Sequence, residues 1–218
     1  MQVIAIDGPA GSGKSTVGRA LAERLGLTYL DTGAMYRGVA FAALRRGIDP
    51  ADAEPVAHLM EHLELEVGDR SLMVDGVDAS IEIRGPEVTR AVSVVAANPA
   101  VRAELRSRQR EWAERHGGGV IEGRDIGTVV FPDAQLKVYL TASPEVRAAR
   151  RSKEVADLDY ETVARDIARR DALDPGREDS PLTQDDAAVL VDTSDKGVAA
   201  IVDELLALLA AAGGEVPS

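Results

Sequence analysis

The feature that most constrains the fold of this chain is a glycine-rich segment near its start. Residues 8–15 read GPAGSGKS and fit the pattern G-x-x-x-x-G-K-[ST]. The short apolar run VIAI at 3–6 precedes the segment, and apolar residues at helical spacing follow it as far as Gly26. A strand, a loop and a helix in this order direct backbone N–H groups and a positive dipole end at one point, which predicts phosphate binding. The expected phosphate ligands are Gly8, Gly11, Ser12, Gly13, Lys14, Ser15 and Thr16.

The composition is that of an ordinary globular protein. Its 218 residues suffice for one domain with a sizeable core and a small insert. No apolar run approaches the ~20 residues of a membrane span, and residues 1–7 lack the basic start and cleavage site of a signal peptide. The absence of cysteine excludes disulfides, thiolate catalysis and Cys-ligated metals. We therefore expect a cytoplasmic protein without a membrane partner.

The charge balance argues against a nucleic-acid partner. The net charge is −12, whereas duplex binding draws on phosphate neutralisation by many Lys and Arg side chains. Aromatic residues make up only 3% of the chain, which leaves few platforms on which single-stranded bases could stack. A polyanionic small molecule could still bind where positive side chains are concentrated locally. Separately, we expect the protein to act as a monomer.

Five short apolar runs alternate with stretches of helical periodicity. The runs occupy residues 3–6, 28–30, 120–122, 136–140 and 188–191. This alternation predicts an α/β fold of the P-loop NTPase type, with a parallel five-stranded sheet and helices on both faces. Ligands of such sheets bind at the carboxyl ends of the strands, where Asp7, Asp31 and Glu122 occur. The expected helices include residues 34–46, 50–63, 100–115, 160–173 and 197–212.

Residues 64–84 interrupt the α/β pattern. Short alternating runs at 65–67, 72–74 and 81–83, separated by glycine-containing turns, predict a small antiparallel meander outside the main sheet. We therefore expect three parts. They are a core at 1–63, 85–142 and 181–218, an insert at 64–84 and a basic helical lid at 143–180.

The basic residues favour a kinase over other P-loop proteins. The chain lacks the N-K-x-D and D-x-x-G signatures of guanine-nucleotide switches. It carries two basic clusters, Arg147–Arg150–Arg151–Lys153 and Arg165–Arg169–Arg170–Arg177. Transfer of a phosphoryl group between two polyanions is catalysed mainly by positioning and charge neutralisation. Of these residues, we expect Arg151, Arg170 and Arg177 to contact phosphate, whereas a solvated salt-bridged helix explains Arg165 and Arg169 equally well.

Two further interpretations concern metal ions. The hydroxyl of Ser15 and the bound phosphates would hold Mg²⁺, with most of its shell remaining water. Residues 58–62 also satisfy H-x-x-E-H, a zinc-peptidase pattern, but no further ligand is assigned and an ordinary amphipathic helix explains them better.

Three stretches together resemble the bacterial cytidylate kinase family of nucleoside monophosphate kinases. They are residues 8–16, DTGAMYR at 31–37 and GRDIGTVVFPDA at 123–134. The first is shared by many P-loop proteins, whereas the last is distinctive of this family. The resemblance extends from Val3 to about Asp192 and so covers nearly the whole chain.

The resemblance implies ATP-dependent phosphorylation of CMP and dCMP with Mg²⁺, in pyrimidine nucleotide metabolism. It also implies a CMP-side insert and a lid. The residues implied to hold the phosphate and ribose of CMP are Asp31, Thr32, Tyr36, Arg37, Arg124 and Asp174. The implied cytosine-binding residues are Ser93, Arg102 and Asp125, and the implied catalytic residues are Lys14, Arg124, Arg151, Arg170 and Arg177.

The residues alone leave alternatives open. A kinase of another small acceptor, such as a different nucleoside monophosphate or a hydroxy acid, fits the same loop and basic clusters. A P-loop switch or binding module without acceptor chemistry belongs to another class altogether. Turnover that depends on the acceptor distinguishes these possibilities.

Overall fold

The structure is a computed structural model that describes residues 1–154, 159–174, 179 and 182–214. The chain divides into two compact units. The first unit comprises Met1–Tyr29 and Trp112–Ser218, and the second comprises Leu30–Glu111. Among the described residues, no helix is long and apolar enough to cross a membrane.

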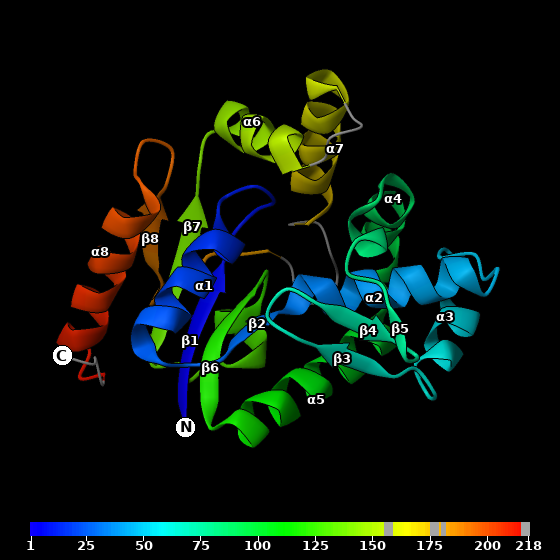
Figure 1. Cartoon of the computed structure of the whole chain (residues 1–218), viewed down its shortest axis with the longest axis horizontal. Helices are drawn as coiled ribbons and strands as arrows, with labels where there is room; N and C mark the ends of the chain where they lie inside the picture. Colours follow the sequence, from blue (N-terminus) through cyan, green and yellow to red (C-terminus); the bar gives the residue numbers. More distant parts are fainter. Residues whose placement is uncertain (155–158, 175–178, 180–181, 215–218) are drawn as a thin grey trace. The chain divides into compact units, whose positions relative to one another are not determined.

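The main sheet is parallel and has five strands, as predicted (Figure 1). Its strand order is β2-β6-β1-β7-β8. The strands are β1 (Gln2–Asp7), β2 (Tyr29–Asp31), β6 (Gly118–Gly123), β7 (Leu136–Thr141) and β8 (Val189–Asp192). The central strand β1 pairs in parallel with β6 and β7, and β7 pairs with β8. The carboxyl ends of β1 and β6 therefore lie side by side, with Asp7 opposite Gly123.

Helices α1 (Lys14–Leu25) and α8 (Val198–Ala211) pack on one face of the main sheet. The core there joins Ile4 and Ile6 of β1 to Leu21 of α1 and Leu205 of α8, all completely buried. Because side chains alternate along a strand, Asp7 points to the opposite face. That face carries η2 (Ile126–Val130), a short π-type turn that contacts β1 and β6.

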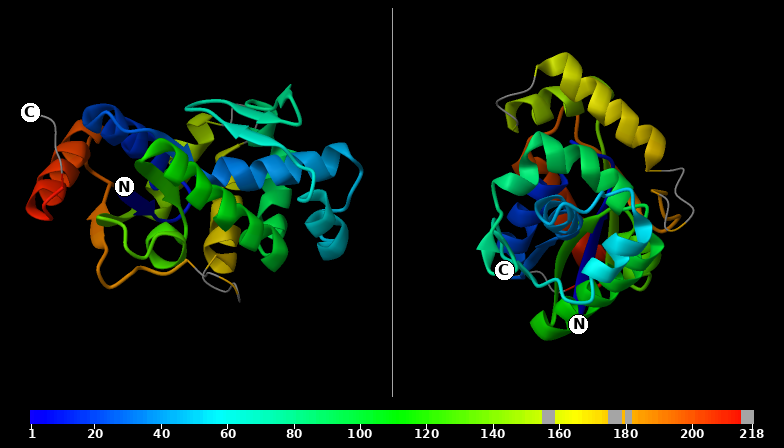
Figure 2. Two further views of the ribbon diagram at one scale, coloured as in Figure 1. Left: turned by 90° about the horizontal axis from the view of Figure 1, so that it is seen from below. Right: turned by 90° about the vertical axis from the view of Figure 1, so that its right-hand side faces the viewer.

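Two further helices of the first unit form a pair (Figure 2). They are α6 (Pro144–Glu154) and α7 (Tyr160–Leu173), and they lie side by side. A small apolar core of Ala148, Val163 and Ile167 joins them. The predicted helix at 160–173 is thus confirmed, and Asp159 caps it by accepting a hydrogen bond from the Thr162 amide.

The second unit is mainly helical. Its helices are α2 (Thr32–Arg45), α3 (Ala53–Leu59), the 3₁₀ turn η1 (Glu82–Arg84), α4 (Pro86–Val95) and most of α5 (Pro99–His116). Helix α2 packs against α4 and against the small sheet. Helix α4 was not predicted from the sequence, although Pro86 at its first turn is a typical helix start.

The small sheet is a separate antiparallel meander, as predicted, but its third strand was misplaced. The strands are β3 (Leu65–Val67), β4 (Leu72–Val74) and β5 (Val77–Asp78). Asp75 and Gly76 both have positive φ angles, 49° and 72°, so the two-residue turn starts β5 at once. Residues 81–83 then enter the η1 turn, where Ile83 is buried and Ile81 is 83% exposed.

The helix predicted at 50–63 is shorter in the structure. The Asp49 side chain accepts a hydrogen bond from the Ala51 amide, and its carbonyl accepts one from the Asp52 amide. These bonds close a turn at 49–52 in place of the first helical turn. Helix α3 therefore begins at Ala53 and ends at Leu59.

Candidate active site

The glycine-rich loop joins β1 to α1 as predicted. Gly8, Gly11 and Gly13 have positive φ angles of 146°, 76° and 90°. The loop wraps around the start of α1, where Lys14 is 8% exposed and its Nζ donates a 2.8 Å hydrogen bond to the Pro9 carbonyl. The geometry is that of a phosphate-binding loop at a helix N-terminus.

Side chains from elsewhere in the first unit bind two carbonyls of this loop. Thr193, just after β8, donates through its hydroxyl to the Ser12 carbonyl at 3.0 Å. Arg147 of α6 donates to the Ala10 carbonyl at 3.3 Å. These two bonds hold the loop against α6 and against the segment that follows β8.

Gly8 is the position where the loop least tolerates a side chain. A Cβ atom there would lie 2.1 Å from the Leu140 carbonyl oxygen, and its φ of 146° is open to glycine but strained for other residues. We expect Gly8→Ala to lower the free energy of unfolding by more than about 4 kcal/mol, because backbone must move to relieve the contact. Chemical denaturation measures this loss.

The matched control for Gly8→Ala is Gly197→Ala. Gly197 caps α8 with an ordinary φ of −73°, and a Cβ atom there would meet no atom within 4 Å. We expect this substitution to cost less than about 1 kcal/mol. Equal losses from the two variants would contradict the close approach at Gly8.

An acidic side chain lies beside the first hydroxyl of α1. The Ser15 hydroxyl donates a 2.7 Å hydrogen bond to Oε1 of Glu122, which is 3% exposed and lies near the end of β6. Hydroxyl and carboxylate oxygens are the ligands that Mg²⁺ prefers, together with water and substrate phosphates. Ser15 and Glu122 therefore fit a magnesium ion. Elsewhere, the described residues contain no cluster of three or more acidic or histidine groups that could bind a metal without substrate.

Arg124 and Asp174 form a buried ion pair in the first unit. Arg124 Nε donates to Asp174 Oδ2 at 2.9 Å, and Asp174 is 3% exposed. Burial disfavours the charge on Arg124, but Asp174, with smaller effects of Glu122 and Asp7, outweighs burial and raises the pKa of Arg124. Asp125, next in the chain, is 5% exposed. Arg124 and Asp174, both predicted to bind CMP, are thus paired directly.

The basic residues of α6 and α7 separate into two groups. Arg147 forms a two-pronged ion pair with Asp171, at 2.9 and 2.6 Å, and Arg150 donates to Thr193 at 2.8 Å. These two arginines hold the helical pair and the loop together. The salt-bridged interpretation fits Arg169, which pairs with Asp166, whereas Arg165 donates a hydrogen bond to the Thr162 hydroxyl.

The three arginines expected to contact phosphate are only partly described. Arg151 is half-buried near the end of α6. Arg170 is half-buried in α7, with its Nε 3.6 Å from Asp166 Oδ2. Arg177 lies outside the described residues. Their predicted roles therefore stay predictions.

In the second unit, Asp31 and Arg37 form a pair at the start of α2. Asp31 caps the helix, since Oδ1 accepts a 2.9 Å hydrogen bond from the Ala34 amide, while Oδ2 binds Arg37 Nη2 at 2.8 Å. A Cβ atom at position 33 would lie 3.0 Å from Arg37 Nη1, so Gly33 makes room for this arginine. Thr32 is 2% exposed. The cap fixes Asp31, and Asp31 in turn orients Arg37.

Arg102 is an unusually buried arginine of the second unit. It lies in α5 and is 2% exposed, and its Nη1 donates a 3.1 Å hydrogen bond to the Ala96 carbonyl. Its guanidinium lies over the ring of Tyr36, 5.6 Å from the centroid, at cation–π distance. The structure therefore brings together two residues predicted to bind CMP. Ser93 is half-buried in α4.

The H-x-x-E-H pattern does not form a zinc site. Two imidazoles share a helical face only if the helix continues through both, and α3 ends at Leu59. The rings of His58 and His62 have centroids 6.4 Å apart, and His58 pairs with Glu61 at 3.2 Å.

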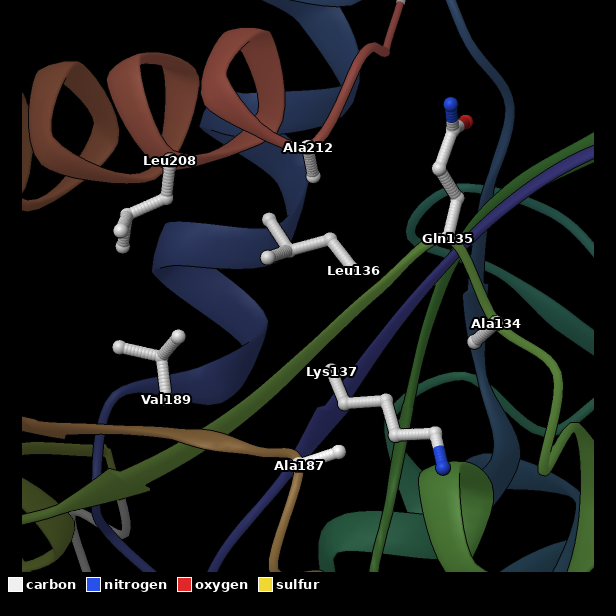
Figure 3. A pocket seen from close by; sticks show the side chains of 8 residues that line it. All are labelled: Ala134, Gln135, Leu136, Lys137, Ala187, Val189, Leu208 and Ala212. Carbon is white, nitrogen blue, oxygen red and sulfur yellow. The ribbon is translucent and has the colours of Figure 1, made fainter.

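A cavity of about 260 Å³ lies away from these residues (Figure 3). Its lining comes from the starts of β7 and β8 and the end of α8, and is largely apolar. Lys137 contributes its carbon chain, while its amine binds Asp185 at 2.9 Å. The cavity contains none of the predicted site residues.

Sequence reasoning missed several residues that contact the loop. Arg147 was placed in a basic cluster without a partner, and Thr193 was not singled out. Glu122 and Asp7 were noted only as polar ends of strands. For Glu122 a signal did exist, because an acidic residue at the end of the strand next to the loop strand is where a magnesium ligand occurs in P-loop enzymes.

These features place the chain in the class of P-loop proteins, with the loop, a hydroxyl at the start of α1 and an acidic residue at the end of the neighbouring strand. A family model described as cytidylate kinase matches residues 4–211. The chain belongs to the cytidylate kinase family and is therefore a kinase, an enzyme that transfers phosphoryl groups.

Individual relatives agree with this membership. A cytidylate kinase from Mycolicibacterium paratuberculosis (strain ATCC BAA-968 / K-10) is 53% identical, over 93% of this chain and 92% of the relative. One from Mycobacterium leprae (strain Br4923) is 49% identical over 98% of both. A crystal structure of an uncharacterized protein from Eubacterium ventriosum ATCC 27560 has a TM-score of 0.55, covering 96% of this chain and 99% of that one. At 14% identity, this likeness shows the fold alone.

Proposed function

We propose that this protein phosphorylates CMP and dCMP to CDP and dCDP, with ATP as the phosphoryl donor. The observation that carries the acceptor assignment is the match of residues 4–211 to the cytidylate kinase family, and Arg102 and Asp125, each buried in its own unit, are proposed to contact the base. Cytosine offers adjacent N3 and O2 acceptors beside the N4 amine donor, so a guanidinium and a carboxylate are its complementary partners. Uracil has a different donor pattern and would leave groups unpaired in such a site. Ser93 is proposed as a further cytosine contact.

The loop is proposed to hold the ATP phosphates. Its N–H groups and the ammonium of Lys14 neutralise the β- and γ-phosphates, in the way that P-loops bind polyphosphates. Ser15 would hold Mg²⁺, and Glu122, whose Oε1 lies 2.7 Å from the Ser15 hydroxyl, would be the neighbouring carboxylate. Bound there, Mg²⁺ would neutralise charge on the phosphate oxygens. Glu122 also fixes the Ser15 side chain in one orientation.

The arginines are proposed to stabilise charge on the transferred phosphoryl group. Arg124 is always protonated, and its ion pair with Asp174 holds this positive charge in place in a buried setting. Arg151, Arg170 and Arg177 are proposed to add charge from residues 143–180, the proposed lid. Closure of a lid excludes water, which would otherwise compete as acceptor.

The phosphate and ribose of CMP are proposed to bind Thr32, Tyr36, Arg37, Arg124 and Asp174. Asp31 contributes by orienting Arg37 through the 2.8 Å ion pair. We further propose that residues 64–84 act as the CMP-side insert on a core of residues 1–63, 85–142 and 181–218. The enzyme is proposed to act as a monomer in the cytoplasm, within pyrimidine nucleotide metabolism.

An ADP-release assay with a panel of acceptors tests this function. With ATP and Mg²⁺ present, we expect turnover that depends on CMP or dCMP and little turnover with UMP, AMP or shikimate. Turnover that requires a different acceptor would make the protein another kinase of small molecules. ADP release at a steady rate regardless of the acceptor would place it among P-loop hydrolases or switches.

A further inference from the structure

Asp7 is a buried carboxylate with two backbone partners from a distant segment. It ends β1, directly before Gly8 of the loop, and is 6% exposed. Its Oδ1 accepts a hydrogen bond from the Ile126 amide and its Oδ2 accepts one from the Gly127 amide, both at 2.8 Å. One side chain therefore uses both of its oxygens to hold a segment 119 and 120 residues further along the chain.

The segment that Asp7 holds begins with Arg124 and Asp125. The two amides belong to the first residues of the η2 turn, where backbone N–H groups lack partners within the turn itself. The carboxylate of Asp7 caps this turn from outside and pins it at the end of β1. Arg124 and Asp125 directly precede the two amides that Asp7 binds, and Gly8 of the phosphate loop directly follows Asp7. Asp7 therefore links the phosphate loop to the residues proposed to bind CMP.

A gain in folding stability does not explain why a carboxylate occupies the buried position 7. Burial raises its pKa to about 6, and the two amide hydrogen bonds and Lys14 offset only part of that effect, while Asp125 adds to it. A carboxyl group whose pKa is higher in the folded protein binds protons more tightly there than in the unfolded chain. Stability from this group is therefore lost as pH rises from about 4 to about 6, and the ionised form is a net cost at neutral pH. Residues that cost stability are typically retained for function.

We propose that Asp7 is a positioning residue for phosphoryl transfer, which holds Arg124 and Asp125 in a fixed place relative to the phosphate loop. This inference rests on the proposed function, in which Arg124 and Asp125 bind CMP, the phosphoryl acceptor. In-line transfer depends on the relative placement of donor and acceptor, and a displacement of about 1 Å can cost about 10²-fold in rate. A carboxylate with one oxygen for each amide fixes both the distance and the tilt of the segment.

The variant Asp7→Asn tests this role with the smallest change in shape. The side-chain amide has one acceptor oxygen and places an N–H₂ group against the other backbone N–H, so one of the two hydrogen bonds is lost. We expect kcat/KM for CMP to fall by about 10- to 100-fold. ATP affinity of the free enzyme should stay within about twofold, because the variant changes no residue of the loop. Removal of the buried charge compensates for the lost bond, so Tm at neutral pH should change little.

The control is Asp49→Asn. Asp49 also accepts a backbone hydrogen bond through its side chain, from Ala51 at 2.9 Å, but it lies in an exposed turn. We expect this variant to keep wild-type turnover. A second variant, Asp7→Glu, retains the charge but moves the carboxylate by one methylene group. We expect it to lose kcat/KM for CMP to a similar extent, since position rather than charge is required.

The outcomes separate the possible failures. Wild-type kinetics in Asp7→Asn or Asp7→Glu would overturn the positioning role, as would a parallel loss of Tm, ATP affinity and turnover, which indicates a merely structural residue. If the wild-type protein itself shows no turnover with CMP, the proposed function fails first and the positioning role fails with it. Normal wild-type turnover beside unaffected variants rejects the positioning role alone.

Discussion

Replacing Lys14 by alanine is expected to lower kcat by about 10²–10³-fold while the fold stays intact. Lys14 is the only lysine of the phosphate loop, and its ammonium already reaches across the loop to the Pro9 carbonyl at 2.8 Å. The loss follows because the charge that develops on the transferred phosphoryl group would no longer meet a fixed cation. Steady-state kinetics with CMP, together with Tm and far-UV circular dichroism, measure both parts of this result.

Lys196→Ala is the matched control for Lys14→Ala. Lys196 is an exposed lysine that pairs with Glu204 at 2.6 Å on the surface of the first unit. Exposed ion pairs contribute roughly 0–1 kcal/mol, so turnover and Tm should stay close to wild type. Unchanged turnover in Lys14→Ala would remove the loop from the mechanism, and a collapse of its Tm would mean that Lys14 is needed for folding.

The second large effect is expected at Arg102 and Asp125, the residues proposed to bind cytosine. Arg102→Ala and Asp125→Ala should each raise KM for CMP by about 10- to 100-fold, because on the proposed assignment each would remove a charge-assisted hydrogen bond to the base. ATP binding to the free enzyme should barely change. Kinetics at varied CMP and calorimetric titration with a non-hydrolysable ATP analogue separate the two affinities.

Arg24→Ala serves as the control for these substitutions. Arg24 pairs with Asp203 at 3.2 Å, and both side chains are more than half exposed. Its removal should leave both affinities unchanged. If Arg102→Ala and Asp125→Ala weakened ATP and CMP binding equally, the acceptor pocket would have been assigned to the wrong residues.

The strand, loop and helix at the start of the chain could be predicted because their signals are local. Apolar residues recur at strand and then helical spacing, and Gly26 ends α1 with a φ of 65°. The third strand of the meander was misplaced because the pattern of Ile81 and Ile83 suits a strand as well as a 3₁₀ turn. What decided between them was the tight turn at Asp75 and Gly76, which starts β5 immediately.

The contacts that build the site are long-range and have no local signal. The sequence placed Arg147 with Arg150 and Arg151 on one helical face, but it could not indicate that Asp171 would take both prongs of its guanidinium. The link from Asp7 to the amides of Ile126 and Gly127 spans more than half of the chain. Backbone amides look the same in every sequence, so only the fold reveals which of them a carboxylate binds.

The most direct test of the account is phosphorus NMR of a mixture of the enzyme, ATP, CMP and Mg²⁺. If the protein transfers the γ-phosphoryl group of ATP to CMP, the signals of ATP and CMP fall together while those of ADP and CDP rise in equal amounts, without release of inorganic phosphate. Release of inorganic phosphate while the CMP signal stays constant would contradict it.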